Sequence, residues 1–152
     1  MRKRCIRRHW AHMDPIALAI AGATVASQVD MEKLRLRDLT AIDNFSTGRA
    51  TLNDFRDVCD IVNLAETMAG MGIGPEVLPV CQAVEQTLLV LKDEFEVRGC
   101  MPIWPDETRT LRDLYEYHDL QRSSIDRSTY ERAIAKTRNR IRSAHPGVKV
   151  LA

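Results

Sequence analysis

Hydrophobic side chains recur every three or four positions along most of this 152-residue chain, which is the spacing of one face of an α-helix. The clearest case lies between Leu52 and Ala69, where apolar residues fall at core spacing. Just before it, Thr51 and Asp54 stand three positions apart, like the two partners of a helix-capping box. The sequence therefore predicts a helix that begins after Thr51 and ends at the glycines of residues 70–74.

The same spacing predicts further helices over residues 15–26, 31–45 and 75–98, from the end of the loop CMPIWPDET, residues 100–108, to about residue 121, and over residues 129–144. Asp30 is the expected cap of the second of these, Gly99 the expected stop of the third, and Ser128 with Glu131 the expected capping box of the last. No convincing strand and no apolar run of membrane-spanning length is found. We expect an all-α, single-domain bundle of five to six helices over residues 14–147, with a basic arm at 1–13 and an apolar tail at 148–152.

Composition fits a folded protein in a reducing compartment. Hydrophobic residues make up 45% of the chain and charged residues 28%, which is ordinary for a soluble globular domain. The four cysteines form no CxxC pair, and Cys59 and Cys81 lie within apolar helical patterns, where free cysteines pack as small hydrophobic residues. We expect a cytoplasmic protein without a disulfide framework.

Charge is distributed unevenly, although the formal net charge is only +1. Residues 1–13 carry five basic and no acidic side chains, and residues 129–152 carry six basic side chains against Glu131. The remaining residues hold 11 basic and 20 acidic side chains. Basic ends on an acidic body indicate either a surface for polyanions or charge matching within the molecule.

The N-terminal stretch MRKRCIRRHWAHMDPIALAIAGATVAS has three interpretations. Its basic start and apolar run imitate a signal peptide, but Asp14 followed by Pro15 is a typical start of a helix in a folded protein. Cys5, His9 and His12 imitate half of a zinc site, but no further close ligand pair completes it.

We favour the third interpretation, a cationic arm that leads into the helix at 15–26. Such an arm can neutralise phosphates, and its aromatic side chain can stack on a base or fill a pocket; the alternative is a frayed chain end. The residues of this arm that are candidates for partner binding are Arg2, Lys3, Arg4, Arg7, Arg8 and Trp10.

Two single residues have a structural and a functional interpretation. Trp104 lies in a loop with two prolines, and we expect it to plug the core; the alternative is an exposed anchor for a protein partner. His118 lies on a partly apolar helix face, and we expect a hydrogen-bonded packing residue rather than a catalytic one.

Motifs of catalysis are missing from the sequence. It contains no GxSxG, HExxH, paired-carboxylate motif or phosphate loop, and the glycines of MAGMGIGPEV follow a predicted helix where nucleotide-binding glycines follow a strand. We therefore expect a protein that is not an enzyme and that uses no metal or other cofactor.

The segment SSIDRSTYERAIA, residues 123–135, resembles the turn and recognition helix of helix-turn-helix proteins. Ser124 stands where that pattern has its turn glycine. The resemblance implies that the residues in contact with DNA are Arg127, Ser128, Thr129 and Arg132.

Two longer segments, NLAETMAGMGIGPEVL and LRDLYEYHDLQRSSIDRSTYERAI, resemble those of short helical accessory proteins carried by proteobacterial phages and plasmids. The resemblance implies a non-enzymatic protein that binds a host protein or nucleoprotein complex stoichiometrically, as an anti-CRISPR-type inhibitor does. A DNA-binding regulator is the alternative, an assembly component is a third class, and the oligomeric state stays open. The expected contact surface includes the basic face of the last helix, Lys136, Arg138, Arg140 and Arg142.

Overall fold

Five α-helices make up the part of the chain that the computed structural model describes, residues 28–144. They are α2 (Gln28–Ser46), α3 (Leu52–Gly70), α4 (Leu78–Arg98), α5 (Pro105–Ser123) and α6 (Arg127–Arg142), with a short 3-10 helix, η1 (Pro75–Val77), before α4. Residues 28–144 contain no strand. The predicted all-α, single-domain fold is confirmed, while the predicted basic arm, the helix at 15–26 and the apolar tail lie outside the described residues.

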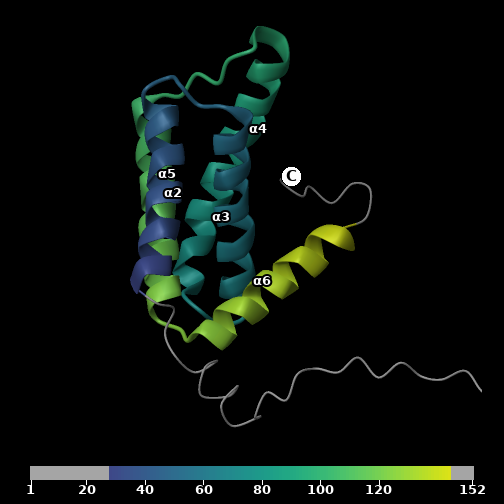
Figure 1. Ribbon diagram of the computed structural model, residues 1–152. Helices are drawn as coiled ribbons and strands as arrows, with labels where there is room; N and C mark the ends of the chain where they lie inside the picture. Colours follow the sequence, from purple (N-terminus) through teal and green to yellow (C-terminus); the bar gives the residue numbers. More distant parts are fainter. Residues whose placement is uncertain (1–27, 145–152) are drawn as a thin grey trace, which may run out of the picture.

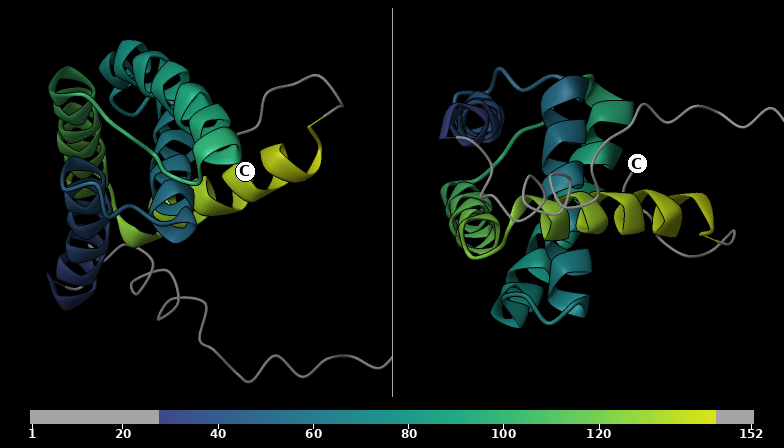
Figure 2. Two further views of the ribbon diagram at one scale, coloured as in Figure 1. Left: turned by 90° about the horizontal axis from the view of Figure 1, so that it is seen from above. Right: turned by 60° about the horizontal axis from the view of Figure 1, so that its bottom comes forward.

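The first four of these helices stand side by side, and α6 crosses the lower end of the bundle at an angle (Figure 1). Both α2 and α4 pack against α3 and α5. Seen from above, α6 extends to one side of the bundle (Figure 2). Because its main contact is with α3, α6 is the described helix that the rest of the bundle covers least.

The core lies between the four upright helices and is almost entirely aliphatic. Its largest fully buried apolar side chains are Phe45, Val58, Ile61, Val62, Met68, Val77, Val84, Leu88, Leu91, Leu111 and Leu114. Cys59 and Cys81 are buried among them, as predicted. Burial raises the pKa of each thiol to about 12, so both stay protonated and act as packing groups.

The predicted capping box at the start of α3 is present and also ties α3 to α2. The Thr51 hydroxyl accepts from the Asp54 N–H at 3.4 Å, and the Asp54 carboxylate accepts from the Thr51 N–H at 2.7 Å. Asn44, near the end of α2, donates its side-chain amide to the same carboxylate at 2.9 Å. This cap therefore fixes the turn between the two helices as well as the first residue of α3.

Four predicted helix starts are wrong, each by a few residues. Helix α5 begins at Pro105, within the residues expected to form a loop, because a proline suits the first position of a helix. Helix α2 begins at Gln28, so Asp30 lies inside its first turn instead of capping it.

The helix predicted from Pro75 is split, because Pro79 lacks the N–H that an α-helix would use to bond the carbonyl of Pro75. That carbonyl accepts instead from Leu78, which closes a 3-10 turn.

The start of α6 is the fourth correction. Asp126 caps the helix in place of Ser128, since its carboxylate accepts from the Thr129 N–H at 2.6 Å. Ser128 therefore lies within the first turn of α6. The capping residue precedes the first helical residue, so Ser128 cannot be the cap.

Trp104 does not plug the core: it is 74% exposed. Its backbone N–H is held by the Glu107 carboxylate at 2.8 Å, which places Trp104 as the cap residue of α5 with its indole outside the bundle. Two other residues before α5 contact the core: Met101 is buried in it, and Ile103 packs against it.

Candidate functional site

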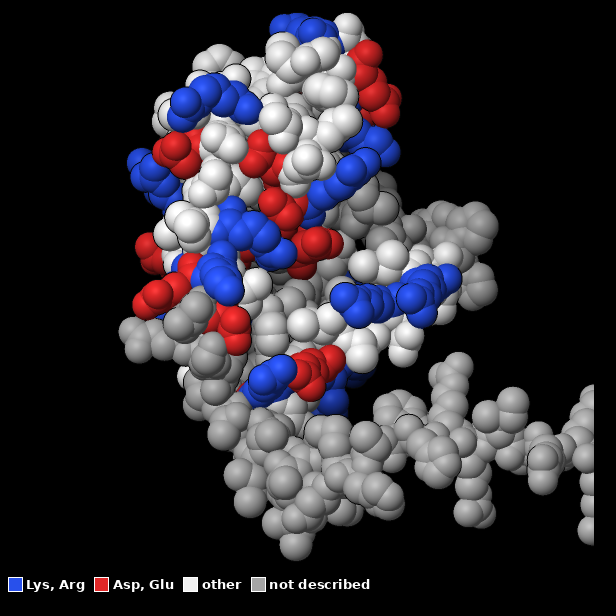
Figure 3. Space-filling model, in the orientation of Figure 1, with Lys and Arg blue, Asp and Glu red and all other residues white. Residues whose placement is uncertain are grey.

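The basic side chains of α6 fall into two groups, those held by acidic or polar partners and those without a partner in the described part of the chain. Lys136, Arg138 and Arg142 are exposed and make no ion pair or hydrogen bond within residues 28–144. Figure 3 shows Lys and Arg side chains along the visible face of α6, beside a bundle surface on which both signs of charge are mixed. We call Lys136, Arg138 and Arg142 the α6 cations.

The other basic residues predicted on this helix have partners. Arg127 pairs with Glu131 at 2.9 Å, and Arg132 donates to the hydroxyl of Thr129 at 3.1 Å. Arg140 was predicted on the outer surface with the α6 cations, but it turns toward α3, where it pairs with Glu66 at 3.0 Å and donates to the carbonyl of Asn63 at 3.1 Å. Ser128 is half-buried in the first turn of α6.

The structure therefore brings part of the predicted set together on α6 and reassigns Arg140 to holding that helix in place. The candidates Arg2, Lys3, Arg4, Arg7, Arg8 and Trp10 lie outside the described residues.

A groove of about 240 Å³ lies beside the contact of α6 with α3 and is lined by residues of α2, α3, α5 and α6. Its walls are largely aliphatic and come from α2, α3 and α6: Leu34, Ile61, Leu64, Ile134 and Ile141. Polar groups at its edges are Arg37, Asp60, Tyr130, Thr137 and Arg138, and His118 of α5 lines it as well. We call this hollow the α6 groove.

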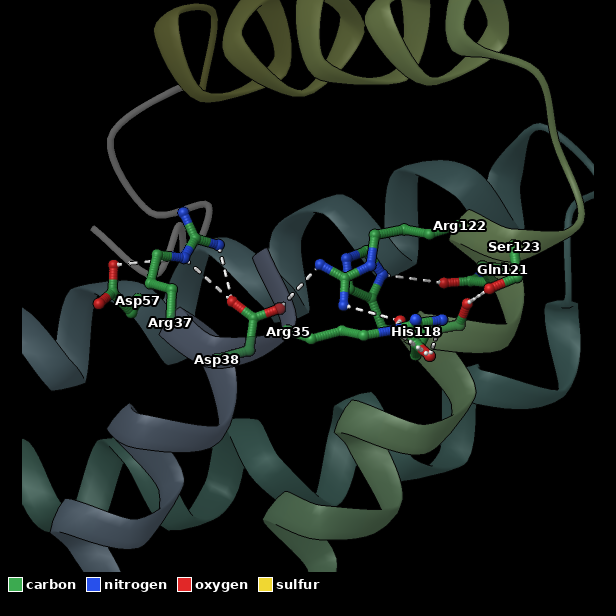
Figure 4. Close-up of polar contacts among 9 residues, drawn as sticks. Arg35, Arg37, Asp38, Asp57, His118, Gln121, Arg122 and Ser123 are labelled. Atoms are coloured by element: carbon green, nitrogen blue, oxygen red, sulfur yellow. Dashed lines mark hydrogen bonds and ion pairs between the residues drawn. The ribbon is translucent and has the colours of Figure 1, made fainter. Parts of the chain in front are cut away.

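A buried ion pair joins α2 to α5 behind this groove (Figure 4). The Asp38 carboxylate and the Arg122 guanidinium are 2.8 Å apart, and their side chains are 0% and 1% exposed. Arg37 reaches the second oxygen of Asp38 at 2.8 Å, and Arg122 also pairs with Asp119 at 3.1 Å. Both carboxylate oxygens of Asp38 and the two terminal nitrogens of Arg122 thus have partners, which favours burial of the ion pair, while Arg122 Nε is buried without a hydrogen bond among the described residues.

Asp119 links this buried pair to the surface. It accepts from Arg35 of α2 at 3.0 Å as well as from Arg122. Burial alone would raise the pKa of Asp119, but the hydrogen bond from Arg35 and the charge of Arg122 outweigh it and lower the pKa. Asp119 therefore stays ionised and completes a chain of alternating charges across the α2–α5 contact.

Gln121 fastens α5 to the loop between α3 and α4. Its side-chain nitrogen lies 2.8 Å from the carbonyl oxygen of Ile73, 3.2 Å from that of Ala65 and 3.3 Å from that of Gly74. The contact is close: a Cβ on Gly74, whose φ is +55°, would lie 2.8 Å from the Cγ of Gln121. The three carbonyls fix the orientation of the amide, because only its nitrogen can donate.

The orientation of Gln121 in turn fixes the tautomer of His118. The Gln121 Oε1 atom lies 3.3 Å from His118 Nδ1, so Nδ1 must carry the proton and Nε2 is left as a hydrogen-bond acceptor. His118 is 2% exposed and its pKa is lowered to about 3, first by burial and then by the charge of Arg122. It is a neutral, hydrogen-bonded packing residue, as the sequence predicted.

Acidification should destabilise the protein through His118. Its pKa lies below the unfolded value of 6.5, so the unfolded state takes up the proton first as the pH falls. Between pH 7.5 and pH 5 we expect a loss of about 2 kcal/mol in the free energy of unfolding. Urea unfolding at several pH values measures it. In His118→Gln the curve should be flat over this range, and an equal slope in the variant would show that other groups cause the loss.

The buried ion pair of Asp38 and Arg122 was not found from the sequence, although a signal was present. Asp38 stands at helical spacing between Leu34 and Ile42, on the apolar face of α2. Arg122 follows His118 by four positions on the apolar face of α5. A charged residue at a core position indicates a buried partner, but the sequence does not say which residue that partner is.

Other kinds of site were sought among the same residues. A second hollow of about 270 Å³ lies between the start of α3 and the end of α4 and is lined by Leu52, Phe55, Phe95 and Met101 with Arg56, Lys92 and Glu96. Within residues 28–144, no three or more His, Cys, Asp and Glu side chains gather as they would around a metal ion. None of the described helices is long and apolar enough to cross a membrane.

The chain matches no family model, no curated protein and no solved structure in the comparisons made with known proteins.

Proposed function

We propose that this protein is a non-enzymatic accessory protein that binds an anionic surface of a host macromolecular machine stoichiometrically through the α6 cations. The observation that carries the proposal is the contrast within α6. Arg127 and Arg140 have acidic partners, while Lys136, Arg138 and Arg142 have none among the described residues. Free cations on a helix that extends from a bundle attract negatively charged partners over several ångströms.

The chemistry of the buried residues supports a binding role over a catalytic one. His118, which is the only histidine among residues 28–144, has a pKa of about 3 and is a poor proton acceptor near neutral pH. The thiols of Cys59 and Cys81 stay protonated. Asp38 and Arg122 neutralise each other, so these groups serve the packing of the bundle.

The class of partner follows from the resemblance to accessory proteins of phages and plasmids. Such proteins act on host machinery, and defence complexes that hold nucleic acid present both acidic protein surfaces and phosphates. We therefore propose inhibition of a CRISPR effector as the specific activity. The protein would act by occupying a site on the effector that is required for function.

A plasmid-transformation assay in cells with an active, plasmid-matched CRISPR system tests this proposal. Expression of the protein should restore transformation, and the triple variant Lys136→Glu, Arg138→Glu, Arg142→Glu should lose most of that effect, about tenfold or more. Lys33→Glu, Arg56→Glu, Arg112→Glu is the matched control, because it changes the same charge at other exposed positions. Equal activity of the two triple variants would contradict a role for the α6 cations.

A helix-turn-helix regulator is the second candidate, and one observation favours it. Helices α5 and α6 are joined by only three residues, 124–126, and Arg127 and Arg132 are exposed at the start of α6. On the other hand, α6 packs chiefly against α3, whereas a recognition helix packs against the helix before it. This candidate predicts DNA affinity that depends on base sequence and falls steeply with salt.

A further inference from the structure

Trp104 presents its indole to solvent from a backbone that is held in place. The Trp104 N–H donates to the Glu107 carboxylate at 2.8 Å, and the Trp104 carbonyl accepts from the N–H of Thr108 at 2.9 Å and from its hydroxyl at 3.2 Å. Tryptophan is highly buried on average in folded proteins, so an exposure of 74% is unusual. Tryptophan is also enriched among the side chains that dominate binding energy, and a fixed backbone lowers the entropy lost on binding.

The hollow between the start of α3 and the end of α4 lies at the same end of the molecule. The start of α3, the end of α4 and the start of α5 are together at the upper end of the bundle, whereas α6 crosses the lower end (Figure 1). The hollow measures about 270 Å³, and its apolar wall consists of Leu52, Phe55, Phe95 and Met101. A cavity of about 150 Å³ takes benzene, so this hollow has room for the larger indole ring. We call it the end hollow.

The rim of the end hollow carries charges that have no partner in the described part of the chain. Arg56, Lys92 and Glu96 line it, are exposed, and make no ion pair or hydrogen bond with residues 28–144. Two cations against one anion leave the rim positive. A cation beside an aromatic ring and a methionine sulfur at the ring edge are both favourable contacts, so the end hollow suits an aromatic side chain with an acidic neighbour.

The start of α5 has this composition. Asp106 follows Trp104 by two residues, its side chain is 92% exposed, and its contact with Arg109 is 3.8 Å long. Exposed pairs of this kind contribute little, so Asp106 is available to the cations of another rim and Arg109 to its Glu96. One end of the molecule thus carries both a projecting indole and a hollow that fits it, as an interface between two identical surfaces requires.

We propose that a second copy of this chain docks at this end of the bundle, with Trp104 of each copy seated in the end hollow of the other. Because the two contacts are reciprocal, they close a twofold dimer and association stops there. The inference goes beyond the proposed function. It uses the end of the bundle away from α6, so both copies keep their α6 cations exposed, and loss of the dimer should leave binding through α6 unchanged.

Sedimentation equilibrium of the full-length protein, from about 1 µM to about 200 µM, tests the proposal over the range of weak interfaces. We expect the mass to rise with concentration from 17.3 kDa toward twice that value. Trp104→Ala should weaken the dimer about tenfold or more. The matched control is Leu120→Ala, which shortens a 67% exposed side chain near the other end of α5 and should have no effect. A mass of 17.3 kDa at every concentration, or an equally strong dimer in Trp104→Ala, would overturn the proposal.

The charges of the rim give a second test on the same protein. Lys92→Glu should weaken the dimer about threefold or more, because it makes the rim negative where the acidic start of α5 would dock. Lys33→Glu makes the same change of charge at an exposed position of α2 and should leave the dimer unchanged. Equal effects of the two variants would contradict docking at the end hollow.

The fluorescence of Trp104 shows whether the indole itself is buried in the dimer. The chain has two tryptophans, so Trp10→Phe leaves Trp104 as the single emitter. Its emission should shift to shorter wavelength, and its quenching by acrylamide should fall, over the same concentrations at which the mass rises. A rise in mass with unchanged emission would mean that another face makes the dimer, and would overturn the proposal.

Discussion

Asp38→Ala should lower the free energy of unfolding by about 3–5 kcal/mol, because it leaves the buried guanidinium of Arg122 without its main partner. The two groups are 2.8 Å apart and almost fully buried, so water cannot take the place of the lost carboxylate. Arg37 loses a hydrogen-bond partner as well. Urea unfolding followed by circular dichroism at pH 7 measures the change.

Two variants serve as controls for this result. Asp43→Ala removes an exposed carboxylate of the same helix, whose distance to Arg49 is 3.8 Å, and should cost less than about 1 kcal/mol. Replacing both buried partners, as Asp38→Leu with Arg122→Met, should recover much of the stability because no unpaired charge remains. A cost below about 1 kcal/mol for Asp38→Ala would show that water or another residue reaches Arg122.

Gln121→Leu should cost about 2–4 kcal/mol, because it leaves several buried polar groups without partners. The variant removes the donor shared by the carbonyls of Ala65, Ile73 and Gly74 and the acceptor of His118 Nδ1. The leucine fills a similar volume, so the loss reports hydrogen bonding more than packing. The same unfolding measurement applies.

The matched control for Gln121 is Gln86→Leu, an exposed position in the middle of α4 that should change stability by less than about 0.5 kcal/mol. Similar small effects of both substitutions would mean that the loop between α3 and α4 is held by something other than Gln121. We expect the backbone amides of this loop to exchange hydrogen faster in Gln121→Leu than in the unchanged protein, because the loop loses its side-chain hydrogen bonds. An unchanged exchange rate would show that Gln121 does not hold the loop.

Much of the fold could be predicted from the sequence because local signals coincide with the tertiary structure. The apolar spacing between Leu52 and Ala69 places α3, and the Thr51 box and Gly99 mark the ends of helices where the structure has them. Errors arose where two signals compete within a few residues. Asp126 and Ser128 both suit a helix cap, and the carboxylate nearer the turn is the one used.

The candidate site was only partly predictable, since it depends on contacts between distant residues. The sequence shows that Lys136, Arg138, Arg140 and Arg142 are basic, but it does not show that Glu66, on another helix, neutralises one of them. Likewise, the sequence does not show that Met101 of the loop before α5 is buried while Trp104 is 74% exposed. The pairing and exposure of such side chains depend on contacts between residues that are far apart in the sequence. The periodicity of apolar residues carries no information on these contacts.

Helix α6 connects the packing of the bundle to the proposed binding surface. Its inner face rests on α3 through Arg140, and its exposed side chains include the α6 cations, of which Arg138 also lines the α6 groove. Substitutions that weaken the Asp38–Arg122 pair should therefore act on stability first, and on binding only when the bundle no longer positions α6. Substitutions of the α6 cations should reduce binding in a folded protein.

Fluorescence anisotropy of labelled DNA and RNA probes of two unrelated sequences, at low and high salt, tests most directly whether α6 binds through charge or by reading bases. The account predicts no preference between sequences, and loss of any low-salt affinity in the Lys136, Arg138, Arg142 triple variant. Preferential binding of one DNA sequence, altered by Arg127→Ala or Arg132→Ala and unaffected by the triple variant, would contradict it and identify a DNA-binding regulator.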